Sequence, residues 1–385
     1  SPLTTHQLPL TNNYSLIHMK KIQISQPVTG IEEWEAVKEP FMSGWLTAGP
    51  KVREFEQLFA ERHQVKHAIA VTSATAALHV ALVALGVAEG DEVIVPAFTW
   101  VSTANVVLYC GATLVFVDID TKTFNLDPQK LKEKITNKTK AIIPVHLFGL
   151  CADMDAIKKI AGKIPLVEDG ACAAGAAYKN KPAGGLGNIG CFSFHPRKSI
   201  TTGEGGMITT NDDSLAELIS QLRNHGASIS EEQRHHGPKP YILADFNIMG
   251  FNYRMTDIQG AVGAVQLGKL DQFIEERNHW ASYYTKELAN IPWLKTPEFT
   301  SNYSHGWQSF VTMVDEDKAP MSRNDLMEYL QLKGISTRPG THAVHMLNFY
   351  KEKFGIKPED FPEAKKANDF SMAIPLHNRM VKEDY

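Results

Sequence analysis

The sequence predicts an α/β protein with a mostly parallel sheet that helices cover on both faces. From about residue 65 to residue 210, short β-branched runs alternate with stretches whose apolar residues recur at i, i+3 and i+4. Several runs, such as Val93-Ile94-Val95-Pro96, are apolar throughout, as strands buried on both faces are. Alternating strands and helices of this kind favour a layered domain around a parallel sheet. The length of 385 residues leaves room for a second, smaller domain.

Seven strands and four helices are expected in this first region. The strands are expected at residues 68–72, 92–96, 114–118, 141–145, 166–169, 191–194 and 207–210. The helices are expected at residues 75–85, 102–110, 128–135 and 154–161.

A second region follows a loop rich in His, Gly and Pro at residues 235–240. One long helical pattern covers residues 257–288, a strand is expected at 308–314 and a helix at 323–333. We therefore predict an N-terminal extension and arm at 1–40, a large α/β domain at 41–289 and a small α+β domain at 290–385. Residues 381–385 resemble the start of a helix, which suggests an incomplete C-terminus.

The composition excludes several classes of protein. Lys and Arg total 39 and Asp and Glu total 43, a net charge of −4, so nucleic acid is not expected as a partner. The four cysteines form no C-x-x-C pair, which is typical of reduced thiols in a cytoplasmic protein. Polar residues, including His79, interrupt the most apolar stretch at 68–88, so no membrane span is predicted.

The first 18 residues are polar and contain no apolar segment typical of a signal peptide. They precede Met19-Lys20-Lys21, which is typical of a natural start, so residues 1–18 are left out of the fold prediction.

Three clusters of residues carry chemistry. The first, Ser73-Ala74-Thr75, lies where a strand ends and a helix begins, so backbone N–H groups and the helix dipole there favour a phosphate. A plain N-cap role for Ser73 is the alternative.

The second cluster, Glu168-Asp169, ends an apolar strand, where open α/β sheets bind ligands. A buried carboxylate there needs a cationic partner, although a helix cap or a metal ligand fits the pattern equally well.

The third cluster is a polar, glycine-rich loop over residues 193–206 with Lys198 near its centre. An exposed lysine is a poor nucleophile at neutral pH, and neighbouring cations such as Arg197 or burial would activate it. An isolated loop lysine is more often simply solvated.

Together, an anion cradle, a strand-end aspartate and a loop lysine are what a pyridoxal phosphate site requires. Their order and spacing resemble the DegT-like sugar aminotransferase family of fold-type I pyridoxal phosphate enzymes. The resemblance covers residues 44–376. It includes the motifs GWLTAGP (44–50), GDEVIVP (90–96), PVHLFG (144–149) and GFNYRMTD (250–257).

This resemblance implies roles for individual residues. Lys198 is implied to bind the cofactor aldehyde and to move a proton during catalysis, and Asp169 to pair with the ring nitrogen. Trp100 is implied to stack on the ring, with a core tryptophan as the alternative. The cofactor phosphate is implied to contact Ala74, Thr75 and Ser193, and also Asn252 of the partner subunit. A shared site of this kind implies a homodimer.

The sequence departs from the family pattern at Cys172, where relatives often carry Gln or His, and the resemblance implies that this position contacts the cofactor. Lys198 itself argues against the side branch that has His at this position.

The stretches 73–75, 99–103 and 193–195 resemble enzymes that aminate C4 of nucleotide-linked 4-keto sugars. Family members contact substrate around residues 336–345, so Arg338 and His345, together with His195, are candidate substrate residues. His342 and His345 lack a third ligand at suitable spacing, so no metal site is expected.

We therefore expect an aminotransferase that moves an amino group, from L-glutamate, onto a keto-sugar. The favoured acceptor is a nucleotide-linked 4-keto-6-deoxy sugar for cell-surface polysaccharide, such as the O-antigen of lipopolysaccharide. Two alternatives stay open: a free keto-sugar acid such as an 8-oxo octulosonate as acceptor, and a non-catalytic sensor or assembly subunit. A nucleotide-binding dehydrogenase is disfavoured because no G-x-G-x-x-G opens a helix after a strand.

Overall fold

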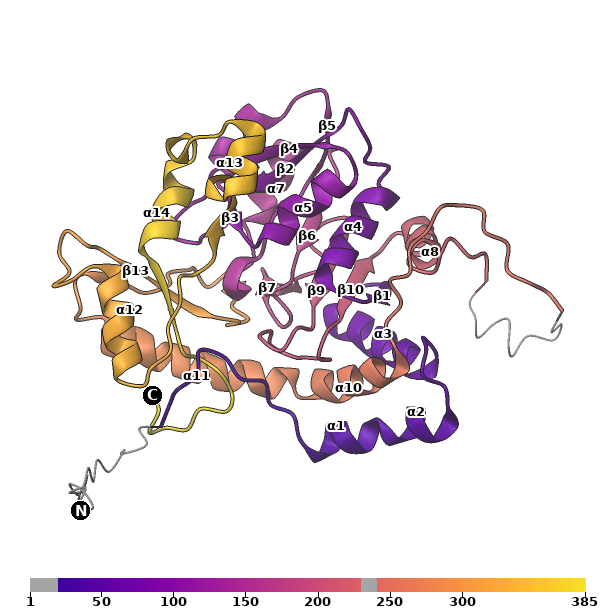
Figure 1. Cartoon of the computed structure of the whole chain (residues 1–385), viewed down its shortest axis with the longest axis horizontal. Coiled ribbons are helices and arrows are strands. Elements are labelled where there is room, and N and C mark those ends of the chain that lie inside the picture. The colour runs from indigo at the N-terminus through magenta and orange to yellow at the C-terminus, as the bar shows by residue number, and fades with distance from the viewer. Residues whose placement is uncertain (1–19, 230–240) are drawn as a thin grey trace, which may run out of the picture.

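A seven-stranded sheet forms the centre of the computed structural model, which describes residues 20–229 and 241–385 (Figure 1). The strands follow the order β4 (Thr113–Val117), β2 (Glu92–Pro96), β5 (Thr139–Ile142), β6 (Val167–Asp169), β9 (Ile189–Ser193), β10 (Gly206–Thr210) and β1 (His67–Val71). Parallel bridges from Ile142 to Leu166 and from Val145 to Asp169 join β5 to β6. Only β10 runs antiparallel to its neighbours, so the predicted mostly parallel sheet is confirmed.

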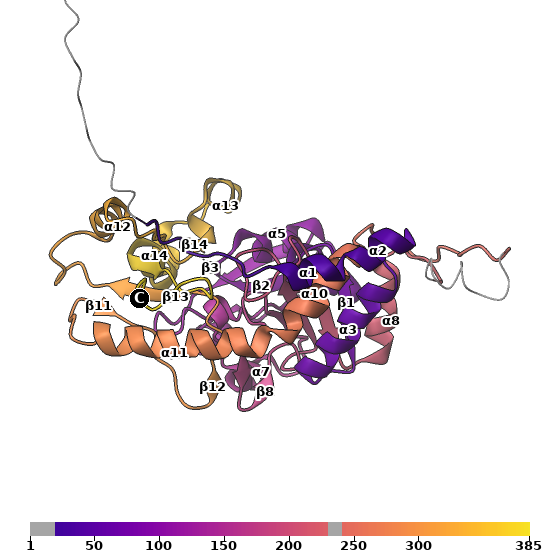
Figure 2. The same ribbon diagram turned by 90° about the horizontal axis from the view of Figure 1, so that it is seen from below.

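Helices cover both faces of this sheet, because alternate strand residues are apolar on each side. One face packs against α4 (Ala74–Ala84), α5 (Val101–Tyr109) and α8 (Asp213–Leu222). The other face packs against α3 (Pro50–His63), α6 (Pro128–Leu131), α7 (Met154–Ala161) and α10 (Asp257–Gly268). The layers, α1 (Ile31–Ala36) and α2 (Lys38–Ser43) can be followed in Figures 1 and 2.

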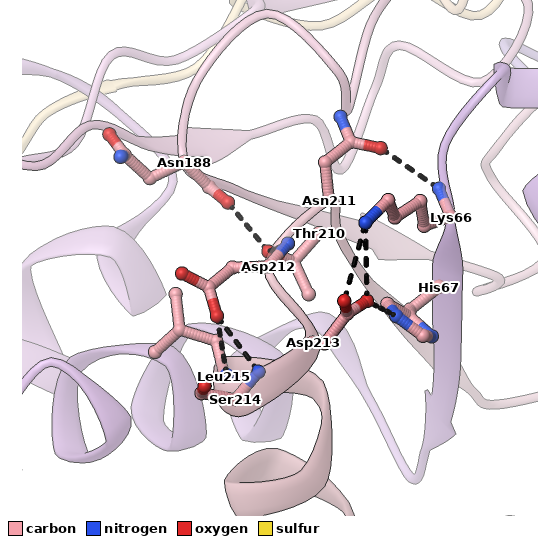
Figure 3. Close-up of polar contacts among 9 residues, drawn as sticks. All are labelled: Lys66, His67, Asn188, Thr210, Asn211, Asp212, Asp213, Ser214 and Leu215. Carbon is pink, nitrogen blue, oxygen red and sulfur yellow. Dashed lines mark hydrogen bonds and ion pairs between the residues drawn. The ribbon is translucent and has the colours of Figure 1, made fainter.

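The turn between β10 and α8 fixes the end of β10 that lies away from Gly206 (Figure 3). Asp212 caps α8 by accepting hydrogen bonds from the N–H groups of Ser214 and Leu215. Asn211 accepts a hydrogen bond from the backbone N–H of Lys66, 2.9 Å away, and the Asp213 carboxylate lies 2.7 Å from Nε2 of His67. These contacts hold β10 against the start of β1 and support the register that continues to Gly206.

The long helical pattern at 257–288 forms two helices rather than one. α10 ends at Gly268, Lys269 (φ −94°, ψ −8°) lies between the two helices, and α11 (Leu270–Leu288) begins directly after it. The Lys269 N–H bonds to the carbonyl three residues earlier, at Gln266, rather than four. The Lys269 ammonium group lies 2.7 Å from the carboxylate of Glu33 in α1, so the break also anchors the N-terminal arm.

The C-terminal part builds its own antiparallel sheet of β11 (Leu294–Lys295), β13 (Phe310–Val314) and β15 (Ser371–Ile374). It also contributes α12 (Arg323–Leu332), α13 (Asn348–Phe354) and α14 (Pro362–Phe370). Its short strand β14 (His342–Ala343) pairs with β3 (Phe98–Thr99), which directly precedes α5. This pairing brings the segment around Arg338 to the large sheet. The domain boundaries near residues 40 and 290 stay a prediction.

The expected helix at the C-terminus is absent. Residues 381–385 form a turn in which the N–H of Asp384 donates to the carbonyl of Val381. The Tyr385 ring stacks on Trp280 of α11, with centroids 4.1 Å apart, and this packing fixes the turn. The expectations for residues 1–18 and for the 235–240 loop lie outside the described residues. Among the described helices, none combines the length and apolar character needed to cross a bilayer.

Candidate active site

Strands β1, β9 and β6 end at one edge of the sheet, and their ends bring the three sequence clusters together. Gly206 lies directly opposite both Val71 of β1 and Ser193 of β9. Asp169 lies opposite Cys191, two residues before Ser193 and on the same face of the sheet. The predicted phosphate, aspartate and lysine segments therefore share this edge, as expected for a ligand site in an open α/β sheet.

The N-terminus of α4 forms an anion cradle. Ser73 is its N-cap, and its hydroxyl accepts the N–H of Ala76, which leaves the N–H groups of Ala74 and Thr75 without an intrahelical partner. Gly206 lets the chain pack closely here, because a Cβ atom at this position would lie 2.5 Å from the carbonyl carbon and oxygen of Ser73. Ser73 thus has the cap role, and the free N–H groups beside it are available to a phosphate.

Glu168 and Asp169 point to opposite faces of the sheet, because successive side chains alternate along a strand. Glu168 is fully buried, 2.9 Å from Nε2 of His146, and accepts hydrogen bonds from the N–H groups of Gly184 and Gly187. His146 Nδ1 accepts the N–H of Ala152, so the ring proton lies on Nε2 and is donated to Glu168. All of these partners are within the protein, so Glu168 has a structural role on the face of the sheet opposite to Asp169.

Asp169 has no such set of protein partners. Its side chain is 4% exposed, and its two oxygens accept one hydrogen bond each, from the Thr103 hydroxyl at 2.7 Å and the Ala171 N–H at 3.1 Å. Within residues 20–229 and 241–385, no Lys, Arg or His forms an ion pair with it. A buried carboxylate without a cation calls for a positive group from a ligand.

Lys198 lies in the loop between β9 and β10, half-buried beside Cys172. Its ammonium group is 3.2 Å from the Cys172 Sγ atom, and its backbone N–H donates to the carbonyl of His195. The loop is held from within, because the Thr201 hydroxyl donates to the carbonyl of Phe194 and accepts the N–H of Gly203. Lys198 is therefore presented on a fixed loop, with no carboxylate beside it in the described part of the chain.

Arg277 of α11 supports this loop from beneath. Its guanidinium group is buried and donates to the Ser199 hydroxyl, the Trp307 carbonyl and the Asn378 side chain. All three partners are neutral, and burial lowers the pKa of Arg277 to about 10. The lysine loop, α11 and the C-terminal segment are thus joined through Arg277, which contacts Ser199, the residue after Lys198.

Arg338 lies at the same place, connected to the lysine loop by hydrogen bonds. Its Nη2 atom is 3.4 Å from the Ser309 hydroxyl, which donates to Gln308, and Gln308 donates to the backbone carbonyl of Arg197. The Nε atom of Arg338 is buried and has no hydrogen-bond partner among the described residues. Burial lowers the pKa of Arg338, and the Arg197 charge lowers it further. An anion bound here would satisfy both guanidinium groups.

The remaining predicted residues differ in how well the structure places them. Trp100 begins α5 at this edge and is 57% exposed, with its ring edge-on to that of His342 at 5.6 Å. His195 is half-buried, its Nδ1 accepts the N–H of Arg197, and burial lowers its pKa. Asn252 is exposed, and its backbone forms an antiparallel bridge with Asn224.

His345 requires a correction. Its side chain is fully buried, its Nε2 donates to the carbonyl of Pro358, and its ring packs edge-on against that of Phe361. A side chain enclosed in this way has no surface to offer a substrate. The sequence suggested it because it lies in the substrate-contacting stretch, but the short helical turn at residues 344–346 directs it into the core.

Three residues of this edge had no role in the sequence analysis. Thr103 holds Asp169, Gly206 lies against Ser73, and Gln308 joins Arg338 to the lysine loop. The i, i+4 spacing of Thr99 and Thr103 after a strand was a usable signal for the first of them. Nothing in the sequence places Gln308 beside residue 197.

The residues present fit pyridoxal phosphate. The cradle of Ala74 and Thr75 suits its phosphate, Asp169 suits its protonated ring nitrogen, and Lys198 suits its aldehyde. When bound, the cofactor supplies a ring that withdraws electrons from the carbon bearing the amino group. A buried carboxylate opposite a cradle of free N–H groups is the arrangement that this group requires.

Comparison with known proteins gives the same answer. Residues 27–385 match the model of the DegT/DnrJ/EryC1/StrS aminotransferase family. The spore coat polysaccharide biosynthesis protein SpsC of Bacillus subtilis is 40% identical over 363 residues, which cover 94% of this chain and 93% of that protein.

Solved structures agree with this family assignment. Spr1654 of Streptococcus pneumoniae, assigned as a sugar aminotransferase and solved in its pyridoxal phosphate form, is 29% identical, with a TM-score of 0.87 over 94% of this chain and 95% of that one. PseC of Helicobacter pylori, an aminotransferase of pseudoaminic acid biosynthesis, is 27% identical, with a TM-score of 0.86 over 94% and 96% of the two chains. The predicted fold type and cofactor are thereby confirmed. The chain belongs to the DegT/DnrJ/EryC1/StrS family and is a pyridoxal phosphate-dependent sugar aminotransferase.

Proposed function

We propose that this enzyme transfers an amino group from L-glutamate to C4 of a nucleotide-linked 4-keto-6-deoxy sugar, for a cell-surface polysaccharide. The observation that carries the enzymatic part is the buried Asp169 carboxylate, which has no cationic partner among the described residues and lies at the same edge of the sheet as the Lys198 loop. The polysaccharide named for SpsC and the pseudoaminic acid named for PseC support an amino sugar as product.

In this proposal the residues of the sheet edge divide the work. Lys198 binds the cofactor, and its amine later carries the proton that leaves the carbon bearing the donor nitrogen. Asp169 holds the ring nitrogen by charge and hydrogen bond, while Ala74, Thr75 and Ser193 hold the phosphate. Trp100 covers one face of the ring, and Cys172, 3.2 Å from the lysine amine, lies against the bound group.

Arg338 supports a carboxylate-bearing amino donor. Its buried Nε atom has no hydrogen-bond partner within residues 20–229 and 241–385, and the hydrogen bonds through Ser309 and Gln308 fix its distance from the lysine loop. A planar guanidinium binds a carboxylate with two parallel hydrogen bonds, which an ammonium group does not reproduce. His195, on the loop itself, is proposed as a sugar contact.

A second copy of the chain is the proposed partner, with Asn252 completing the neighbour's phosphate site. The residues around α2 and the segment 241–249 expose unusually large apolar side chains: Phe41 (60%), Met42 (87%), Tyr241 (77%), Leu243 (77%) and Met249 (85%). Figures 1 and 2 both place α2 and the segment 241–249 at the same end of the molecule. We also propose the cytoplasm as the location, because all four cysteines are free thiols.

The decisive experiment identifies the lysine. Borohydride reduction of the holoenzyme, followed by peptide mapping, is expected to label Lys198, and Lys198→Ala is expected to fold, bind cofactor and lose more than about 1,000-fold of its transamination rate. Lys181→Ala, at an exposed lysine on β8 (Lys181–Pro182), is the control and should keep wild-type activity. An active Lys198→Ala variant, or a label elsewhere, would refute the proposal.

The acceptor is tested with a panel of keto-sugars, each offered with and without its nucleotide. Turnover of the nucleotide-linked 4-keto sugars alone supports the proposed acceptor. Turnover of free sugar acids alone would overturn it.

A further inference from the structure

We infer that Thr103, supported by Thr99, is a positioning residue that fixes the orientation of the Asp169 carboxylate toward the cofactor ring nitrogen. The inference rests on the proposed role of Asp169. The Thr103 hydroxyl lies 2.7 Å from one carboxylate oxygen of Asp169 and 3.0 Å from the Thr99 hydroxyl. The three side chains form a continuous hydrogen-bonded chain from Thr99 in β3, through Thr103 in the first turn of α5, to Asp169 at the end of β6.

The direction of this chain follows from the chemistry of its members. An ionised carboxylate only accepts hydrogen bonds, so the Thr103 hydroxyl donates its single proton to the hydrogen bond with Asp169. Toward Thr99 it is then left as the acceptor, and the Thr99 hydroxyl must donate. Each hydroxyl therefore polarises the next in the same sense, which strengthens the bond that reaches the carboxylate.

Burial of the three side chains protects their hydrogen bonds from water. Thr103 has no exposed surface, Thr99 is 1% exposed and Asp169 is 4% exposed, so water does not compete for these bonds. With Thr103 on one oxygen and the Ala171 N–H on the other, the carboxylate plane is fixed by two donors. One lone pair on each oxygen stays free for the ring nitrogen.

The chain also extends to the C-terminal part of the protein. Thr341 donates to the backbone carbonyl of Thr99 at 3.2 Å, and His342 is paired with Thr99 in the β3–β14 ladder. The segment that follows Arg338 therefore braces the far end of the chain. These contacts hold the backbone of Thr99, so its hydroxyl is available to donate a hydrogen bond to the Thr103 hydroxyl.

The test compares Thr103→Val, Thr103→Ser, Thr99→Val and the double valine variant with wild type, measuring kcat, KM and the dissociation constant for pyridoxal phosphate. Loss of a hydrogen bond to a charged acceptor is expected to lower kcat about tenfold and to weaken cofactor binding about tenfold, with KM changed less than about twofold. Thr103→Ser should restore both quantities. Because Thr99 acts through Thr103, the double variant should be no worse than Thr103→Val.

Two controls separate this role from a general loss of packing. Thr209→Val removes an equally buried hydroxyl, which donates to the Gly184 carbonyl at 2.7 Å, and should lower the melting temperature without lowering kcat. Asp169→Asn tests the role on which the inference rests. Wild-type kcat and cofactor affinity in Thr103→Val, alongside a defective Asp169→Asn, would overturn the inference alone, as would equal defects in Thr103→Val and Thr103→Ser. Wild-type behaviour of Asp169→Asn would overturn the role of Asp169 itself.

Discussion

Arg338 holds a guanidinium group next to the lysine loop, and its buried Nε atom has no hydrogen-bond partner in the part of the chain that the structure describes. Replacing it tests whether the donor carboxylate binds there. Arg338→Gln is expected to raise the KM for L-glutamate at least 30-fold, since loss of one member of a buried charged pair removes about 2 kcal/mol or more of binding. The KM for the sugar should change little, and Arg338→Lys should recover only part of the loss, because an ammonium group lacks the planar fork.

A second buried arginine supplies the control. Arg323 lies in the same C-terminal part and donates to the carbonyl of Ser371, and burial lowers its pKa as it does that of Arg338. Arg323→Gln should lower stability and leave the glutamate KM unchanged. A rise in sugar KM with an unchanged glutamate KM in Arg338→Gln would assign the guanidinium to the acceptor instead.

Single residues also show where sequence reasoning succeeds. The sequence proposed Asp169 and Lys198 because strand ends and glycine-rich loops are typical of ligand sites in α/β sheets, and the structure brings their segments to the same end of the strands, while their roles stay predictions. Arg338 and His345 lie in one stretch, and the sequence favoured both equally as substrate residues. Only the folded backbone shows that His345 is buried in the core and that Arg338 lies beside the lysine loop. The contact of Gln308 with the Arg197 carbonyl joins residues 111 positions apart, which no local pattern predicts.

At the scale of elements, the position of α4 depends on the absence of a side chain at Gly206. A Cβ atom there would lie 2.5 Å from the Ser73 carbonyl group and 2.8 Å from the Ala74 nitrogen, which are backbone atoms that cannot rotate away. Gly206→Ala is therefore expected to displace the N-terminus of α4 and to weaken cofactor binding at least tenfold. The dissociation constant for pyridoxal phosphate measures this effect.

Gly268→Ala is the matched substitution for this experiment, because a Cβ atom there meets nothing within 4 Å. It should leave cofactor affinity unchanged and stabilise α10 by up to about 1 kcal/mol, since alanine favours a helix over glycine. An unaltered cofactor affinity in Gly206→Ala would contradict the assignment of the cradle to α4.

The elements themselves were largely predictable from periodicity. All seven strands of the large sheet were expected, because apolar runs bounded by turn residues are distinctive when both faces are buried. The break at Lys269 was not predicted, since the apolar pattern continues through it, and the contact of Lys269 with Glu33 in a distant helix leaves no local pattern in the sequence. The turn at the C-terminus was missed for the same reason: it is fixed by stacking on Trp280.

At the scale of the whole molecule, the proposed site is incomplete in one chain. Asn252 is exposed and follows the segment 241–249, where Tyr241, Leu243 and Met249 expose large apolar side chains that we propose a second copy covers. Obligate two-fold dimers bury apolar surface of this kind, and in the dimer that we propose each chain would give Asn252 to the other's cradle and receive it in return. The protein of two 42.8 kDa chains should sediment as a single dimeric species.

Mixing two inactive variants tests this sharing directly. Lys198→Ala lacks the reactive amine and Asn252→Ala lacks the contact given to the neighbour, so each homodimer should be inactive or strongly impaired. When the two are unfolded and refolded together in equal amounts, half of the dimers are hybrids. In each hybrid, one site takes Lys198 from one chain and Asn252 from the other, and is intact. Activity should therefore recover to about one quarter of wild type, the statistical limit for a two-fold dimer. If both residues served the same chain's site, every hybrid site would lack one of them and mixing would restore nothing.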